Sequence, residues 1–126
     1  MTAIDLKKIT PELFLEVAED KAKAFERERG RNESSQLRKF YNEVCQFEEK
    51  LTGYSNPKEQ KEQFDRIYPL LCMLVPKAVY AKTRKHVDDN FVTMMRDCIK
   101  QVNSPETLRN FRLFFEAIIA YLPKNK

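Results

Sequence analysis

Apolar residues recur along the chain at helical spacing, and short polar turns separate these stretches. Thr10-Pro11-Glu12 predicts the start of a first helix, because threonine caps helices and proline fits the first helical position. The charged segment Glu26–Ser35 has no apolar side chain and predicts a loop. A second helix is expected to open at Ser34-Ser35 and run to about Thr52, with Gly53 ending it.

The third predicted helix contains prolines at positions that a helix interior disfavours. Asn56 is expected to cap this helix, and Pro57 takes its first position. Pro69 and Pro76 lack the amide N–H that an interior position needs. We therefore expect a break near one of these two prolines, with a helix restarting by about Lys77.

Two further helices are predicted behind recognisable capping residues. One begins at about Asp88, and the other follows Asn103-Ser104-Pro105-Glu106, where serine caps and proline takes the first helical position. The aromatic residues of the last helix are expected to lie in the core, although its apolar face is broad enough for part of it to serve a subunit contact. These residues are Phe111, Phe114, Phe115 and Tyr121.

This pattern predicts an all-α fold, a small bundle of five or six helices. We expect one domain over residues 1–126: an N-terminal helix and charged loop at 1–33, a bundle core at 34–122 and a polar tail at 123–126. The chain has only two glycines in 126 residues, and a β-rich domain of this length normally needs more for its turns.

Composition narrows the location and the chemistry. No apolar run is long enough to span a membrane, and the N-terminus has no apolar block after its charges, so we expect a cytoplasmic protein. The three cysteines are far apart and are expected to be buried free thiols; they are Cys45, Cys72 and Cys98. The spacing of histidines, cysteines and acids predicts no metal site, and two isolated glycines allow no phosphate loop, so no cofactor is expected.

The sequence gives no positive sign of catalysis. His86 is the only histidine and stands in a basic segment, where an ordinary surface histidine is the simpler interpretation. An enzyme centred on His86 or Cys98 is the alternative, and it lacks acid–base partners in the sequence. We therefore predict a protein that is not an enzyme.

Positive charge is concentrated in the second half of the chain. Residues 1–63 carry a formal charge of −1 and residues 64–126 carry +5. The segment Lys77–His86 holds four cations and no acid. If this segment is helical, Lys77, Tyr80 and Arg84 line one face and Lys82 and Lys85 lie beside them, an arrangement that suits successive phosphates. A solvated helix face is the alternative interpretation.

Two cations of the second helix form another candidate site. Arg38 and Lys39 stand beside its core positions, and the alternative for Lys39 is an intrahelical ion pair with Glu43. Three arginines of the charged loop are weaker candidates because acids surround them. They are Arg27, Arg29 and Arg31.

Three segments resemble one family. They are Ser34–Val44 (SSQLRKFYNEV), Pro76–Arg84 (PKAVYAKTR) and Phe114–Tyr121 (FFEAIIAY). In this order they resemble the small subunit of the Csm complex, the type III-A CRISPR effector, over about residues 34–122. The first 30 residues match no part of this resemblance.

The resemblance implies a non-catalytic helical bundle that stacks in a filament and contacts guide and target RNA. It also implies that the other subunits of the complex perform RNA and DNA cleavage. Arg38, Lys39, Lys77 and Arg84 match basic positions of the family, whereas Lys82 and Lys85 rest on charge alone. Tyr80 and Tyr121 match family positions as packing residues. The alternatives are a protein-interaction adaptor without RNA binding and the small subunit of a related CRISPR type.

Overall fold

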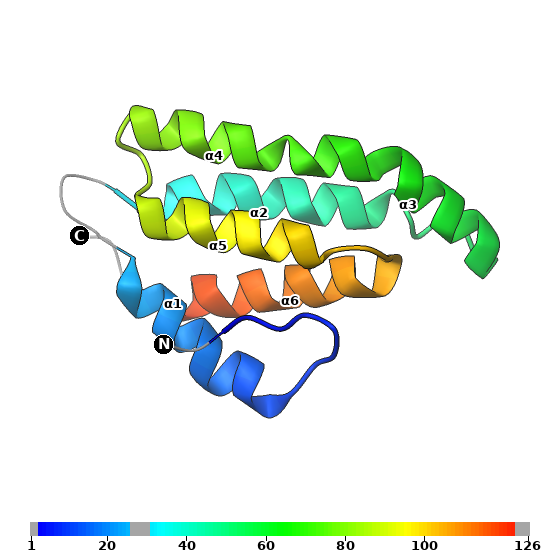
Figure 1. Cartoon of the computed structure of the whole chain (residues 1–126), viewed down its shortest axis with the longest axis horizontal. Helices are drawn as coiled ribbons and strands as arrows, with labels where there is room; N and C mark the ends of the chain where they lie inside the picture. Colours follow the sequence, from blue (N-terminus) through cyan, green and yellow to red (C-terminus); the bar gives the residue numbers. More distant parts are fainter. Residues whose placement is uncertain (1–2, 26–30, 123–126) are drawn as a thin grey trace.

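A computed structural model describes residues 3–25 and 31–122, and these residues form helices joined by turns, with no strand among them. In chain order the elements are a π-helical turn η1 (Leu13–Val17) and helices α1 (Ala18–Ala24), α2 (Ser34–Glu49), α3 (Pro57–Cys72), α4 (Leu74–Thr83), α5 (Asp89–Gln101) and α6 (Pro105–Tyr121). The predicted all-α bundle is confirmed. Figure 1 shows α2, α4, α5 and α6 running along the long axis, with α1 crossing below α6.

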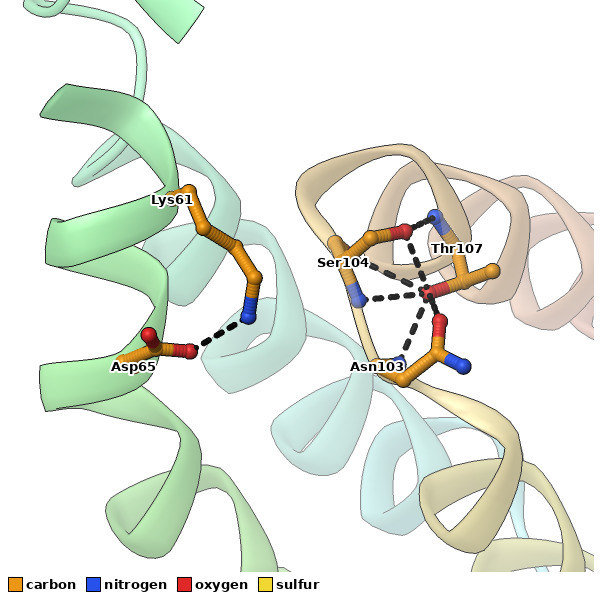
Figure 2. A network of polar contacts seen from close by, with 5 residues as sticks. All are labelled: Lys61, Asp65, Asn103, Ser104 and Thr107. Atoms are coloured by element: carbon orange, nitrogen blue, oxygen red, sulfur yellow. Dashed lines mark hydrogen bonds and ion pairs between the residues drawn. The ribbon is translucent and has the colours of Figure 1, made fainter. Parts of the chain in front are cut away.

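The turn before α6 forms the capping arrangement that the sequence predicts. The Ser104 hydroxyl accepts a hydrogen bond from the Thr107 N–H at 3.1 Å, and the Thr107 hydroxyl accepts one from the Ser104 N–H at 3.0 Å. Figure 2 shows this capping box, with the Asn103 N–H also donating to the Thr107 hydroxyl. Reciprocal bonds of this kind satisfy two backbone donors that a helix start leaves without a partner.

Side-chain capping also marks three other predicted helix starts. The side-chain oxygens of Thr10, Asn56 and Asp88 each accept a hydrogen bond from a backbone N–H two or three residues later. Removing such a cap typically costs about 1 kcal/mol. The starts of these elements are therefore fixed locally, before any tertiary contact forms.

The break in the third predicted helix lies between its two prolines, at Met73. Pro69 is inside α3 close to its end, and Pro76 lies in the first turn of α4, where a backbone N–H has no partner within the helix. Met73 itself keeps a right-handed helical conformation. Figure 1 accordingly shows α3 and α4 as one bent rod.

The second helix ends earlier than predicted. α2 begins at Ser34, but its last residue is Glu49, and the chain turns through Lys50–Thr52 before it reaches Gly53. The Leu51 N–H donates to the Glu48 carbonyl at 3.0 Å, a bond that tightens the turn, and Leu51 is buried. Leu51 is thus buried from a turn and not from a helix. Helical periodicity does not predict this, because the burial depends on tertiary contacts.

α6 lies at the centre of the core. Phe111, Phe114 and Phe115 are fully buried, and Phe91 of α5 reaches them from the next helix. α1 and α2 cover α6 most extensively. The prediction that these aromatic residues lie in the core is confirmed for the three phenylalanines and is wrong for Tyr121. Tyr121 remains 36% exposed.

Two amide side chains, the partly buried Gln101 and the buried Asn110, hold the segment before the first helix against the bundle. Gln101 donates to the Ile4 carbonyl at 2.8 Å and accepts from the Leu6 N–H at 2.7 Å. Asn110 donates to the Leu6 carbonyl at 2.9 Å, and Leu6 is fully buried. These bonds satisfy backbone groups that have no helix to pair them.

The cysteine prediction holds for one residue of three. Cys98 is fully buried, whereas Cys45 and Cys72 are partly exposed. All three are free thiols. Cys45 lies within α2 and Cys72 is the last residue of α3. Both stand beside the buried stripe of their helix and are therefore partly exposed to solvent.

Candidate nucleic-acid interface

α4 and the turn after it carry four of the predicted basic residues. Lys77 and Lys82 lie on α4, Arg84 is its C-cap and Lys85 follows. All four are exposed, and Ala78 anchors the helix beneath them with no exposed surface. Val79 is also 40% exposed.

Tyr80 lies on the outer face of α4 and is 63% exposed. The prediction that it is a packing residue is therefore wrong. The Arg84 guanidinium donates to its hydroxyl at 3.3 Å and lies 5.7 Å from the ring centroid. One turn of helix separates the two residues, so this contact follows from their spacing.

Two of the lysines form ion pairs with acids from other elements. Lys77 contacts Glu43 of α2 at 2.9 Å, and Lys82 contacts Asp89 of α5 at 2.6 Å. The predicted alternative, a pair between Lys39 and Glu43, is not the pair that forms. Exposed ion pairs of this kind contribute roughly 0–1 kcal/mol, so a stronger anion can replace the carboxylate.

A left-handed residue closes the C-terminal end of α4. The Lys85 N–H donates to the Lys82 carbonyl and the His86 N–H donates to the Ala81 carbonyl, each at 2.9 Å. This is the Schellman motif, whose first residue beyond the cap takes a positive φ and is usually glycine. Lys85 has a φ of 65° at that position. An exposed cation thus occupies a backbone conformation that disfavours its side chain.

The turn after Lys85 is bonded to the segment that leads into α2. Asn32 is fully buried; its N–H donates to the His86 carbonyl at 2.9 Å, and its side-chain oxygen accepts from the Asp88 N–H at 3.2 Å. Sequence reasoning missed this residue. Its polar side chain within a charged segment gave no sign that it is buried.

The bonds of Asn32 and of Glu43 fix the direction of α2 relative to α4. Asn32 lies at the C-terminal end of α4, while Glu43, eleven residues later, lies at Lys77 near its start. The two helices are therefore antiparallel, and Lys39, one turn before Glu43, comes level with the middle of α4. Arg38 and Lys39 are both exposed. The structure thus brings the two predicted basic groups to neighbouring helices.

Of the three arginines of the charged loop, the structure describes Arg31. Arg27 and Arg29 lie outside the residues that the structure describes. Arg31 is partly buried and lines a cavity of about 280 Å³ together with Lys82 and Asp89. Acids surround it there, as in the sequence.

A second surface lies on the other side of α4. An apolar groove of about 570 Å³ runs between α3–α4 and α5, and Arg96 and Lys100 form its basic edge. Its apolar lining consists of Tyr68, Cys72, Val75, Pro76, Val79 and Ile99. Leu70 and Met73 on the neighbouring outer face are 55% and 50% exposed. Exposed apolar residues that gather in this way mark contact surfaces.

His86 and Cys98, on which the enzyme alternative is centred, both lie in the described part of the chain. Cys98 has no exposed surface, and burial raises the pKa of its thiol above the ordinary range. His86 is held at the α4–α5 turn through its backbone. Within residues 3–25 and 31–122, no group of three His, Cys, Asp or Glu side chains is placed to hold a metal ion. None of the helices in these ranges combines the length and hydropathy that crossing a membrane requires.

Comparison with protein families bears on the interpretation of this surface. A family model described as Csm2 Type III-A matches residues 8–123. The chain belongs to the Csm2 type III-A family. The match includes the N-terminal helix, which the resemblance of residues 34–122 left out. Neither the curated proteins nor the solved structures contain a match to the chain.

Membership identifies this Csm2 chain as a small subunit of a type III-A CRISPR effector complex. It places the chain in type III-A rather than in a related CRISPR type, and it implies association with other Csm subunits. The family match includes α1, which packs on the central helix α6.

Proposed function

We propose that this Csm2 protein is a non-catalytic subunit that holds guide and target RNA by their sugar-phosphate backbones. One observation carries the proposal: the predicted cations of two separate sequence segments lie on the neighbouring antiparallel helices α2 and α4. These cations are Arg38, Lys39, Lys77, Lys82, Arg84 and Lys85. Lysine and arginine side chains in such a row suit phosphates without reading sequence.

The ion pairs of this surface support an exchangeable contact. Glu43 and Asp89 neutralise Lys77 and Lys82 in the free protein at little energetic gain. RNA phosphates, with their condensed counterions, offer a stronger field and an entropic gain from ion release. Binding is therefore expected to be strongly salt-dependent, and repetition of the subunit is expected to strengthen it.

The test is a salt titration of guide–target duplex RNA against the full chain, alone and co-expressed with its partner subunits. The variant Lys77→Glu with Arg84→Glu is expected to bind more weakly and to reduce the slope of log affinity against log salt by about 2. The control is Lys58→Glu with Lys61→Glu on α3. Lys61 is ion-paired to Asp65 at 2.6 Å (Figure 2) and is as exposed as Lys77, so the control matches both charge and pairing.

A slope that does not change in the α4 variant would contradict RNA contact at this surface. Loss of partner binding with no RNA dependence would support the alternative, a protein-interaction adaptor. Equal loss in the control would show a general charge effect without a site.

We further propose that copies of this chain stack head to tail through the apolar groove. The occupant is the outer face of η1 in a second copy, where Leu15 is 65% exposed and stands between exposed Glu12 and Glu16. Its charge is complementary to Arg96 and Lys100 at the groove. Two different surfaces that bind each other form an open filament when the rotation between successive copies does not close a ring.

Charge exchange tests this contact. Glu16→Lys and Lys100→Glu are each expected to reduce concentration-dependent association in sedimentation velocity, and the two combined in one chain are expected to restore part of it. A wild-type chain that remains monomeric at high concentration, and whose stacking in the co-expressed complex survives either change, would refute the proposal.

A further inference from the structure

The exposed ring of Tyr80 stands within the basic row of α4. Lys77 lies three residues before it and Arg84 four residues after it, so the three share one helix face. At 63% exposure it is the most exposed aromatic side chain that the structure describes; Tyr121 follows at 36%. The ring is not part of the core, to which α4 contributes the buried side chains of Leu74 and Ala78.

Arg84 fixes the orientation of the ring. Its guanidinium binds the hydroxyl at 3.3 Å and also lies 5.7 Å from the ring centroid. Holding the ring in place in the free protein reduces the rotamer freedom that binding would otherwise remove. Exposure together with fixed orientation is the arrangement that a stacking surface requires.

We infer that Tyr80, oriented by Arg84, stacks on an unpaired nucleobase of the bound RNA. The inference rests on the proposed RNA-binding function and adds a base contact to the phosphate contacts. Every base presents a π face, so stacking needs no particular sequence. A base inside an A-form duplex is covered on both faces by its neighbours, and hence the ligand is a nucleotide that has left the stack.

The flanking cations fit such a nucleotide. Lys77 and Arg84 are seven residues apart, which is about 10 Å along a helix. They can therefore hold phosphates on either side of one nucleotide while its base meets the ring between them. Lys39 of α2, level with the middle of α4, adds positive charge at the same height.

The experiment compares single-stranded oligouridylate with an oligomer of the same number of phosphates whose sugars carry no base. Three variants of the full chain are measured at one low salt concentration: Tyr80→Leu, which removes the ring; Tyr80→Phe, which removes only the hydroxyl; and Tyr121→Leu, the control on α6. Thermal unfolding followed by circular dichroism checks that each variant folds.

Tyr80→Leu is expected to bind oligouridylate about tenfold more weakly and the base-free oligomer unchanged. Tyr80→Phe is expected to stay within about twofold of the wild type for the oligouridylate, and Tyr121→Leu to match the wild type for both. Equal wild-type affinity for the two oligomers, with salt dependence intact, would overturn the stacking contact and leave the proposed function standing. No salt-dependent binding to either would contradict the proposed function itself. Loss of partner association in Tyr80→Leu, with RNA affinity unchanged, would overturn the inference in favour of a protein contact.

Discussion

Replacing Lys85 by glycine is expected to stabilise the fold and weaken RNA binding at the same time. Lys85 occupies the left-handed position of the Schellman motif at the end of α4, with a φ of 65°. The left-handed region costs an L residue roughly 1–2 kcal/mol, whereas glycine adopts it without penalty. Glycine also makes the unfolded chain more flexible, which offsets roughly 0.4–1 kcal/mol of that gain.

The net expectation is a rise of about 0.5–1 kcal/mol in the free energy of unfolding. Urea unfolding monitored by circular dichroism measures it. Under the proposed function the same variant loses one phosphate contact, so its salt slope for RNA falls by about 1. Stability is thus expected to rise while RNA binding falls. A residue with a structural role alone would not change the two quantities in opposite directions.

Lys50→Gly is the matched control. Lys50 is the C-cap of α2, is exposed and has a φ of −63°, so glycine relieves no strain there. This change is expected to lower the free energy of unfolding by about 0.5–1 kcal/mol. The substitution also removes the contact of Lys50 with the Phe47 ring, which lowers the free energy of unfolding further. Destabilisation of the protein by Lys85→Gly would refute the reasoning about strain at this turn.

Three further outcomes follow from caps, burial and ionisation. Ser104→Ala is expected to lower the free energy of unfolding by about 1 kcal/mol in urea unfolding, and no change would show that the capping box is not stabilising. Native Cys98 is expected to resist thiol reagents until the chain unfolds, because burial raises its pKa; modification of all three thiols at one rate would contradict this. Burial, and then hydrogen bonding to Cys45, raises the pKa of Tyr41 from 10.0 to about 12, so the neutral phenol stabilises the fold fully below pH 10 and this contribution is lost as the pH rises towards 12. Burial also raises the pKa of Tyr68, so ultraviolet difference absorbance should show two late-ionising tyrosines in the folded chain, and a single transition of all tyrosines near pH 10 would exclude these shifts.

Local rules predicted the helix starts because capping is a short-range interaction. Asn56, Asp88 and Ser104 each bond a backbone group within three residues, and sequence spacing alone determines that contact. The break near the prolines was predictable for the same reason. Its position at Met73 was not predictable, because Pro69 lies inside α3 without ending it, while Pro76 lies in the first turn of α4, where a helix tolerates proline.

The candidate site needed long-range information. Glu43 pairs with Lys77 from 34 residues away, while the sequence favoured the nearby Lys39 as its partner. The buried Asn32, which fixes α2 against the α4–α5 turn, bonds over 56 residues. Helical spacing placed Tyr80 on one face with Lys77 and Arg84, whereas the family resemblance implied a packing residue, and the exposed position of its ring agrees with the spacing.

The packing of α1 on α6 has a consequence for synthesis of the protein. The ribosome releases α1 roughly a hundred residues before the helix that it covers. During that interval the apolar side of η1 and α1, including Val17 and Ala18, is not yet covered by α6, because the core phenylalanines of α6 have not yet emerged. The nascent chain therefore exposes apolar surface until late in translation, when folding intermediates are prone to aggregate. Efficient production is expected to depend on chaperones, or on partner subunits translated nearby.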